Sequence, residues 1–137
     1  MSLLPYSILV VDDEPSLASL FRQFFVKLGF DAISFTDPLL ALEHFKQNYG
    51  KYSVILTDMR MPSMSGIDLA NKIRKLNSSV RILLVTAFDN PDLASIENYK
   101  TARIEQIVKK PIRLSVLKQI VEKNLCMDGK SKKPVSK

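Results

Sequence analysis

Residues 8–15 read ILVVDDEP, a run of four apolar side chains followed by three acids and a proline. A run that is apolar at every position is typical of a parallel strand covered on both faces. Similar runs lie at residues 54–56, 82–85 and 107–108, and a weaker, alternating run lies at residues 32–35. The sequence therefore predicts five β-strands.

Helical patterns fill the intervals between these runs, and the first pattern is the most regular. Its apolar residues recur at the spacing of one helix face: Leu17, Leu20, Phe21, Phe24 and Leu28. Pro15 suits the first turn of this helix, and Gly29 suits its end. Weaker patterns predict helices over residues 39–45, 69–76 and 114–125, with a short one over residues 92–99. This alternation favours an α/β fold with a doubly wound parallel sheet.

The composition is that of one globular domain. Of 137 residues, 46% are hydrophobic and 25% are charged, which is enough to form a core and excludes disorder for most of the chain. The single cysteine, Cys126, excludes an intramolecular disulfide and a cysteine zinc cluster. The apolar stretches are far shorter than the roughly 20 residues that span a bilayer, and no signal peptide pattern is present. We therefore expect a cytoplasmic protein without a membrane partner.

Half of the excess positive charge lies at the C-terminal end. The formal net charge is +6, and the last twelve residues carry four lysines against one aspartate. Because this segment has no apolar period, we divide the chain into a domain over residues 1–125 and a basic tail over residues 126–137. The tail is read as a flexible terminus, a linker stub or a basic arm. Nucleic acid is therefore not an expected partner of this chain alone.

Polar side chains follow four of the predicted strands. From the first strand to the fifth they are Asp12 and Asp13, Asp58, Thr86, and Lys110. Parallel strands end at one edge of the sheet, where open α/β folds place their ligand sites. Carboxylates crowded at such an edge repel one another and bind protons more tightly. A cation is therefore expected among them.

Mg²⁺ suits this donor set because it prefers carboxylate oxygens, retained waters and a shared phosphate. Asp13 and Asp58 are expected to ligate it directly, and Asp12 through a water molecule. The alternative for the acidic pair is structural, since acids before Pro15 also cap helix amide groups and favour the positive end of the helix dipole. The convergence with Asp58 and Lys110 favours the metal site.

Asp58 is also a candidate nucleophile. An aspartate at a strand end attacks phosphorus to give an acyl phosphate when a metal and a cation neutralise the transferred group. Lys110 is the candidate cation, and the Thr86 hydroxyl is a candidate donor to a phosphoryl oxygen. Each has an ordinary alternative, because threonine is common in strands and a lysine at a strand end is usually solvated.

Four separated motifs occur in a fixed order. They are DDEP at residues 12–15, D-M-R-M-P-x-M-x-G at residues 58–66, Thr-Ala at residues 86–87 and Lys-Pro at residues 110–111. Over residues 7–125 the chain resembles the receiver domain of two-component response regulators, of the chemotaxis-receiver type. The resemblance implies a flavodoxin-like (βα)5 fold whose five-stranded parallel sheet has the order 2-1-3-4-5.

The resemblance also implies a role for each site residue. Asp58 is implied to be the phosphoacceptor, Thr86 the switch hydroxyl, and Lys110 the contact to the phosphoryl group. The implied ligands of Mg²⁺, or of Mn²⁺ in its place, are Asp12, Asp13, Asp58 and the backbone carbonyl of Arg60. The protein would catalyse only its own phosphorylation and later hydrolysis, so it is not expected to be an enzyme in the ordinary sense.

Two kinds of partner follow from the resemblance. The phosphoryl donor would be a phosphohistidine on a sensor histidine kinase or a phosphotransfer protein, which would approach near Pro15, Ser16 and Ser19. A downstream effector or a second receiver would bind the face made by the fourth helix, the fifth strand and the fifth helix. That face would include parts of residues 93–103 and 115–123.

The chain departs from the family pattern near the fifth strand. Ile107 stands where receivers usually carry Tyr or Phe, and Arg103 and Ile104 stand where the family often has Gly-Ala. We hypothesise that phosphorylation draws Thr86 inward and that the loop after the fourth strand moves in place of an aromatic rotation.

Two bulky residues stand where side chains flank the path of the water that hydrolyses the phosphoaspartate. They are Arg60, two positions after Asp58, and Phe88, two positions after Thr86. They predict slow self-hydrolysis. Arg60 has two further readings: it holds phosphoryl oxygens, or it faces solvent.

Two other functional classes compete with phosphoryl signalling. Ile107 suggests a phospho-independent interaction module with the same fold. An aspartyl-phosphate phosphatase would need an acid two residues after its nucleophile, where Arg60 stands.

The phosphate-loop, dinucleotide and hydrolase motifs GxxxxGK[ST], GxGxxG and GxSxG are absent from the sequence. The only histidine, His44, falls in a helix pattern and is expected to be structural. The intact acidic pair with Asp58 and Lys110 favours phosphorylation.

Overall fold

The computed structural model describes residues 6–87 and 96–126. Its strands are β1 (Ser7–Val11), β2 (Asp31–Phe35), β3 (Val54–Asp58), β4 (Arg81–Thr86) and β5 (Gln106–Lys109). Its helices are α1 (Pro15–Lys27), α2 (Pro38–Gln47), α3 (Gly66–Leu76), α4 (Tyr99–Ala102) and α5 (Leu114–Cys126).

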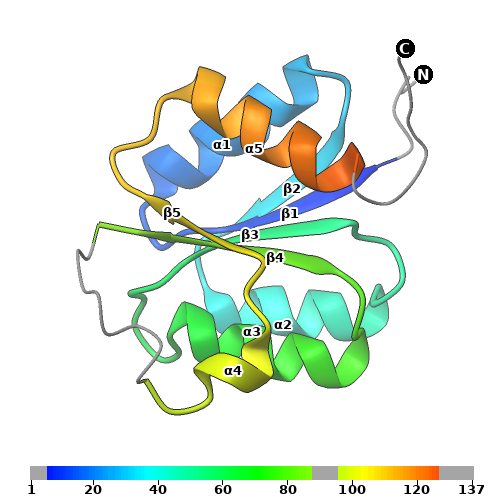
Figure 1. Ribbon diagram of the computed structural model, residues 1–137, viewed down its shortest axis with the longest axis vertical. Coiled ribbons are helices and arrows are strands. Elements are labelled where there is room, and N and C mark those ends of the chain that lie inside the picture. Colours follow the sequence, from blue (N-terminus) through cyan, green and yellow to red (C-terminus); the bar gives the residue numbers. More distant parts are fainter. Residues whose placement is uncertain (1–5, 88–95, 127–137) are drawn as a thin grey trace.

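All five strands are parallel and form one sheet in the order β2-β1-β3-β4-β5. Helices α1 and α5 cover one face of the sheet, and α2, α3 and α4 cover the other (Figure 1). The structure therefore confirms the flavodoxin-like α/β fold and the expected strand order. Within the described residues, no helix is both long and apolar enough to cross a membrane.

The position of each strand in the sheet explains its sequence pattern. β1, β3 and β4 lie inside the sheet and are buried, apart from the partly exposed Arg81. β2 and β5 are the edge strands and are partly exposed. Apolar side chains form one core between the sheet and α2 and α3, and a second core between the sheet and α1 and α5. Continuous apolar runs therefore mark the strands with a core on each face.

Helix α1 confirms the first predicted helix, with one exception on its apolar face. It begins at Pro15, and the chain turns after it at Gly29, whose φ of 100° is readily adopted by glycine. Phe21 is buried as expected, but Leu20 is 44% exposed. Leu20 therefore lies at the margin of the apolar face and is not a core residue.

Helices α2 and α3 begin before the first apolar residue of the pattern that predicted each of them, because a capping residue sets the start of each helix. An Asp37 carboxylate oxygen accepts a hydrogen bond from the Leu39 amide at 2.9 Å. The Ser65 hydroxyl accepts one from the Asp68 amide at 3.1 Å. Both bonds satisfy amide groups of the first helical turn, which have no partner within the helix.

The fourth helix differs from the prediction. The sequence pattern predicts a helix over residues 92–99, but residues 88–95 lie outside the described part of the chain, and α4 starts only at Tyr99. Asn98 before it and Arg103 after it have left-handed backbone, with φ of 72° and 48°. Such conformations end a right-handed helix. The described helix is therefore a single turn.

Polar side chains of α3 hold α4 at both of its ends. Asn71 Nδ2 donates a hydrogen bond to the Asn98 carbonyl at 2.9 Å. Arg74 Nε donates to the Ala102 carbonyl, and Arg74 Nη2 donates to the Arg103 carbonyl, each at 2.9 Å. The two Arg74 bonds satisfy carbonyls at the C-terminal end of α4, which have no partner within a one-turn helix. The Asn98 carbonyl also accepts a hydrogen bond from the Ala102 amide. The side-chain bonds from Asn71 and Arg74 fix α4 to α3.

Gly66 allows α3 to begin directly against the end of β3. A Cβ atom at this position would lie 2.3 Å from the Asp58 carbonyl oxygen and 2.7 Å from Leu84 Cδ1, which is closer than non-bonded atoms approach. The Gly66 amide donates to the Met59 carbonyl at 2.8 Å. Gly66 therefore helps to set the backbone position of Asp58.

Replacement of Gly66 by alanine should strongly destabilise the fold, because the new methyl group would overlap the backbone of Asp58. We expect Gly66→Ala to lower the free energy of unfolding by at least about 2 kcal/mol in urea titrations. Gly50→Ala is the matched control, since nothing lies within 4 Å of the added atom, and it should change stability by less than about 0.5 kcal/mol. Equal effects of the two substitutions would contradict the close approach at Gly66.

Candidate functional site

Three carboxylates meet at the carboxyl end of the sheet. One oxygen from each of Asp12, Asp13 and Asp58 lies within 4.8 Å of the other two. Asp12 and Asp58 are 2% and 8% exposed, and Asp13 is partly exposed. The sequence-predicted acids are therefore brought together in the structure.

The parallel register explains how acids far apart in the sequence reach one place. β1 pairs with β3 so that Val11 lies beside Thr57, and Asp12 and Asp58 are the next residues along each strand. An Asp12 carboxylate oxygen accepts a hydrogen bond from the Glu14 amide at 2.9 Å. Asp12 therefore also orders the turn that leads into α1. This bond is not the helix cap named as the structural alternative, because the N-cap residue of α1 is Glu14 and no side chain caps the helix there.

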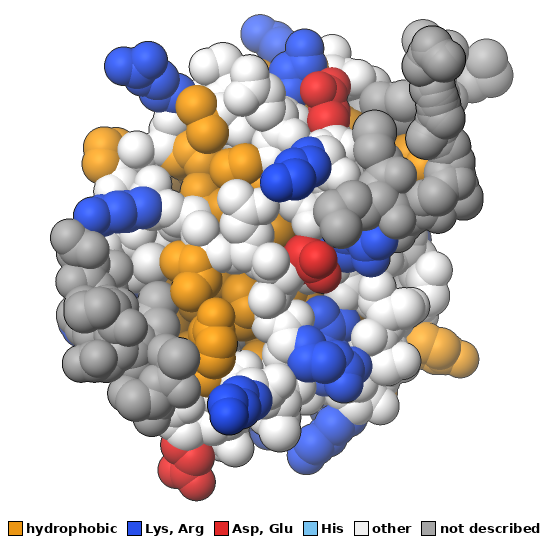
Figure 2. All heavy atoms as spheres, viewed as in Figure 1, with side chains coloured by type: hydrophobic (Ala, Val, Ile, Leu, Met, Phe, Trp, Pro, Cys, Tyr) orange, Lys and Arg blue, Asp and Glu red, His pale blue; other side chains and the backbone are white. Residues whose placement is uncertain are grey.

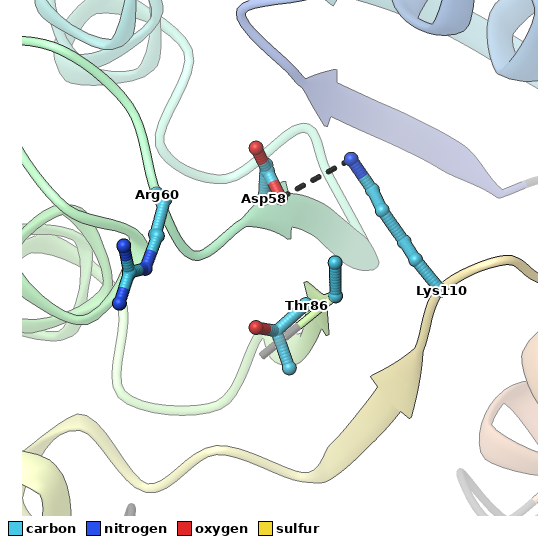
Figure 3. Close-up of a pocket in the computed structure, with 5 residues that line it drawn as sticks. Asp58, Arg60, Thr86 and Lys110 are labelled. Atoms are coloured by element: carbon cyan, nitrogen blue, oxygen red, sulfur yellow. Dashed lines mark ion pairs between the residues drawn. The ribbon is translucent and has the colours of Figure 1, made fainter. Parts of the chain in front are cut away.

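Lys110 is the cation that contacts two of these acids. Its Nζ lies 3.2 Å from Asp12 Oδ2 and 3.3 Å from Asp58 Oδ1, and Figure 3 shows the contact with Asp58. The Lys110 amide donates to the Thr86 carbonyl at 2.8 Å, which ties the residue to the end of β4. Of the two adjacent lysines, Lys109 is exposed and Lys110 reaches the acids.

The charges in this cluster do not balance. Burial raises the pKa of Asp58 from 3.8 to about 6; Lys110 opposes the rise, and Asp12 and Asp13 add to it. Burial lowers the pKa of Lys110, but the negative charges of Asp12 and Asp58 outweigh this effect, so the pKa is raised. Three carboxylates thus share one ammonium in a place shielded from water. Such a cluster favours the binding of a further cation.

A cavity of about 330 Å³ opens beside Asp58. The other lining residues are Arg60, Thr86, Ala87 and Lys110. Thr86 is buried, and in Figure 3 its side chain is directed away from the Asp58 carboxylate, whereas Lys110 extends toward it. Arg60 is exposed, and its guanidinium also points away from Asp58. The cavity therefore gives a small charged group access to Asp58 and Lys110.

A second cavity, of about 340 Å³, adjoins the first and is mainly apolar. It shares Ala87 and Lys110 with the first cavity. Its other walls come from α1 and from the segment after β5: Leu17, Leu20, Phe21, Pro111, Ile112 and Leu114. Helical periodicity assigns the α1 residues to the core, so the sequence pattern alone does not reveal this cavity.

Comparison with known proteins agrees with this geometry. The family model described as the response regulator receiver domain matches residues 8–122. The chain belongs to this family. The resemblance inferred from the four sequence motifs is therefore confirmed, and the cluster of acids lies at the carboxyl end of a receiver-domain sheet.

Two relatives differ in how much of their length this receiver domain matches. It is 34% identical to sensor protein EvgS of Escherichia coli over 112 residues, which make up 82% of this chain but only 9% of EvgS. It is 25% identical to sporulation initiation phosphotransferase F of Bacillus subtilis, over 86% of this chain and 92% of that protein. The receiver domain is thus a small part of one relative and nearly the whole of the other.

A solved structure supports the same assignment. Response regulator protein TrrA of Thermotoga maritima, in complex with Mg²⁺ and BeF, matches with a TM-score of 0.74 and 29% identity. The match covers 87% of this chain and 98% of the TrrA chain. This receiver domain and TrrA therefore share both the fold and a substantial part of the sequence.

The raised pKa of Asp58 predicts a pH-dependent loss of stability in the metal-free domain. The folded state binds a proton more tightly than the unfolded state, so stability should fall as the pH rises from about 4 through about 6. Asp58→Asn removes the buried charge. We expect this variant to be more stable than the wild type at pH 7 by about 1 to 3 kcal/mol, as measured by urea unfolding in EDTA.

The advantage of the Asp58→Asn variant should shrink near pH 4, where the wild-type carboxyl is protonated in the folded state. Equal stabilities at pH 7 would show that the Asp58 carboxylate is not destabilised by its surroundings.

Proposed function

We propose that this chain is a phosphorylatable receiver in which Asp58 accepts a phosphoryl group. The donor would be a phosphohistidine on a sensor histidine kinase or a phosphotransfer protein. The observation that carries the proposal is the position of Lys110 Nζ, which lies 3.2 Å from Asp12 and 3.3 Å from Asp58 at the edge of an open cavity. A buried acid, a fixed cation and access for a small group are what phosphoryl transfer to aspartate requires.

In the transfer step, an Asp58 carboxylate oxygen attacks the phosphorus. The new bond joins that oxygen to phosphorus, and the phosphorus–nitrogen bond of phosphohistidine breaks, with its electron pair left on the imidazole. Lys110 lies where it neutralises charge on the phosphoryl oxygens, as cations do in other phosphoryl transfers. Because the pKa of Asp58 is about 6, the carboxylate is mostly ionised near pH 7.

The donor atoms at this site fit Mg²⁺. Asp12, Asp13 and Asp58 offer oxygen ligands within 4.8 Å of one another, and the Arg60 carbonyl is the fourth proposed ligand. Mg²⁺ prefers such hard oxygen donors, and Mn²⁺ is a substitute that accepts the same ligands. When bound, the metal would neutralise charge on the carboxylates and the phosphoryl group. The complex of TrrA with Mg²⁺ and BeF supports this proposal.

Thr86 is the proposed switch residue. Its side chain lines the cavity but is directed away from Asp58 (Figure 3), so an inward turn would bring its hydroxyl toward a phosphoryl oxygen. Ile107, at the usual aromatic position, is 37% exposed on the edge strand β5. We therefore retain the hypothesis that the loop after β4 carries the response. Residues 88–95 of that loop lie outside the described part of the chain.

The proposed phosphoaspartate is expected to be long-lived. Arg60 lines the cavity beside Asp58, although its guanidinium points away from the carboxylate. Its bulk still borders the approach of a water molecule to the phosphorus. Phe88, the other residue behind this expectation, lies outside the described residues, as does all but the first residue of the basic tail at residues 126–137.

Phosphorylation should be visible as a mass change. After incubation with acetyl phosphate and Mg²⁺, intact mass spectrometry of the wild type should show a gain of about 80 Da, the mass of one phosphoryl adduct. Asp58→Asn should show no adduct. Asp68→Asn, which changes an exposed acid on α3, is the matched control and should be modified like the wild type. An undiminished adduct in Asp58→Asn would overturn the assignment of the phosphoacceptor.

Mg²⁺ should stabilise the domain through the acidic cluster. We expect the melting temperature of the wild type to rise by several degrees at saturating Mg²⁺, because the ion binds only the folded site. Asp13→Asn should reduce the rise by at least half, since it removes one oxygen ligand and one charge, whereas Asp68→Asn should leave it unchanged. Differential scanning calorimetry with EDTA reversal measures both effects, and equal rises in all three proteins would exclude this metal site.

A further inference from the structure

The two edge strands of the sheet, β2 and β5, differ in how they are protected against pairing with another strand. β5 carries an exposed lysine, Lys109, and Figure 2, which views the molecule from this side, shows basic side chains spread over it. Charged side chains on an edge strand oppose such pairing. β2 reads DAISF and contains no Lys, Arg or Pro. Its only charged residue, Asp31, contacts the Ser7 hydroxyl at 3.2 Å and Lys51 Nζ at 3.6 Å.

The outer side of β2 presents backbone hydrogen-bonding groups. The Asp31 amide donates to the Tyr6 carbonyl at 3.2 Å, and the Phe35 carbonyl accepts from the Asp12 amide at 3.1 Å. These bonds run toward β1, and every second residue of a parallel strand bonds to a given neighbour. The amides and carbonyls of Ala32 and Ser34 therefore point away from the sheet. Both residues are partly exposed.

We propose that β2 pairs with β2 of a second copy of this chain, in antiparallel orientation about a twofold axis at Ile33. Ala32 of one copy would then lie opposite Ser34 of the other. Because both residues point outward, each of these two pairs would exchange both of its backbone hydrogen bonds. The same surface meets itself, as a closed twofold dimer requires, and the two sheets become one continuous sheet.

The charges beside β2 are complementary in this arrangement. Helices α1 and α2 both pack against β2 and run opposite to the strands. Each begins at an acidic N-cap, Glu14 or Asp37, and each has a lysine in its last turn, Lys27 or Lys46. The twofold axis would place each helix antiparallel to the same helix of the other copy. Acidic helix starts would then face basic helix ends, and the helix dipoles would oppose one another favourably.

An exposed apolar side chain lies beside the same edge. The His44 ring of α2 lies 5.1 Å from the Phe35 ring of β2, measured between centroids. Leu40 lies one turn before His44 and so shares its helix face. Leu40 is 59% exposed. The α2 helix of a second copy would cover Leu40, and burial of its side chain would add to the affinity.

A second copy fits this edge better than a strand of another protein. The β2 pairing is symmetric in register, and the helix ends on both sides of it match themselves in charge. A foreign strand would gain the backbone bonds alone. The antiparallel dimer would also direct the two Asp58 sites toward opposite ends, because each lies at the carboxyl end of its own sheet. Phosphoryl donors would therefore still reach both sites.

The proposal goes beyond phosphoryl transfer and does not depend on it. Its tests use unphosphorylated protein, so failure of dimerisation and failure of the proposed phosphorylation are separate results. The pairing strands are short, so we expect weak association, with a Kd on the order of 0.1 to 1 mM. Analytical ultracentrifugation over a range of concentrations measures it.

Amide hydrogen exchange, followed by NMR, locates the interface. In the proposed dimer the amides of Ala32 and Ser34 gain partners, so their exchange should slow as the protein concentration rises. The Ile33 amide bonds toward β1 within each copy and should exchange at the same rate at all concentrations. A monomer would show no concentration dependence at any of the three.

Two variants connect association to the edge. Ser34→Pro removes an outward amide, and proline is tolerated on the outer side of an edge strand. This variant should weaken association by at least about tenfold, whereas Ser34→Ala, which keeps the amide, should stay within about twofold of the wild type. Leu40→Gln should weaken association by at least about threefold. Its matched control is Leu76→Gln, at a 36% exposed leucine on α3.

Thermal melting followed by circular dichroism checks that Ser34→Pro is folded; should it unfold, Leu40→Gln and the exchange rates still decide. Three outcomes would overturn the proposal. The first is a wild type that stays monomeric at about 1 mM. The second is a dimer whose concentration-dependent protection falls on β5, or one unaffected by both Ser34→Pro and Leu40→Gln. The third is a monomer whose Ala32 and Ser34 amides become protected only by a peptide of alternating threonine and valine, which would assign the edge to a foreign strand.

Discussion

The positive charge placed among Asp12, Asp13 and Asp58 is the interaction on which the site depends. Three carboxylates within 4.8 Å of one another repel strongly where water is largely excluded. Lys110 contacts two of them and offsets part of this repulsion. The remaining imbalance is seen in the pKa of Asp58, which burial and the neighbouring acids raise despite the lysine. On the proposed function, a divalent metal would offset the negative charge that Lys110 leaves unbalanced.

The scaffold supplies this arrangement through a few close approaches. Parallel pairing of β1 with β3 brings Asp12 and Asp58 to one edge, and Gly66 lets α3 begin against the Asp58 backbone. On the same face of the sheet, Asn71 and Arg74 of α3 hold the single turn of α4 in place. The site therefore lies between well-packed elements.

Sequence patterns predicted the sheet and the acidic cluster because both depend on local rules. Continuous apolar runs mark strands buried on two faces, and parallel strands bring their last residues to one edge. The choice of Lys110 rested on the Lys-Pro motif at residues 110–111, which is part of the resemblance to receiver domains. The predicted fourth helix was wrong over residues 96–98, because Asn98 and Arg103 have left-handed backbone that no apolar period reveals, and these two residues set the bounds of the described turn. The exposure of Leu20 and the apolar cavity beside Lys110 depend on how α1 packs against the segment after β5, which periodicity does not encode.

Titration of the Asp58 carboxyl by carbon NMR, in metal-free wild type and in Lys110→Met, tests the electrostatic account most directly. The account predicts a pKa near 6 in the wild type and a clearly higher pKa in Lys110→Met, because the variant loses the ammonium that opposes the rise. Lys109→Met is the control and should leave the pKa of Asp58 unchanged. A wild-type pKa near 3.8, or the same pKa with and without Lys110, would contradict the account.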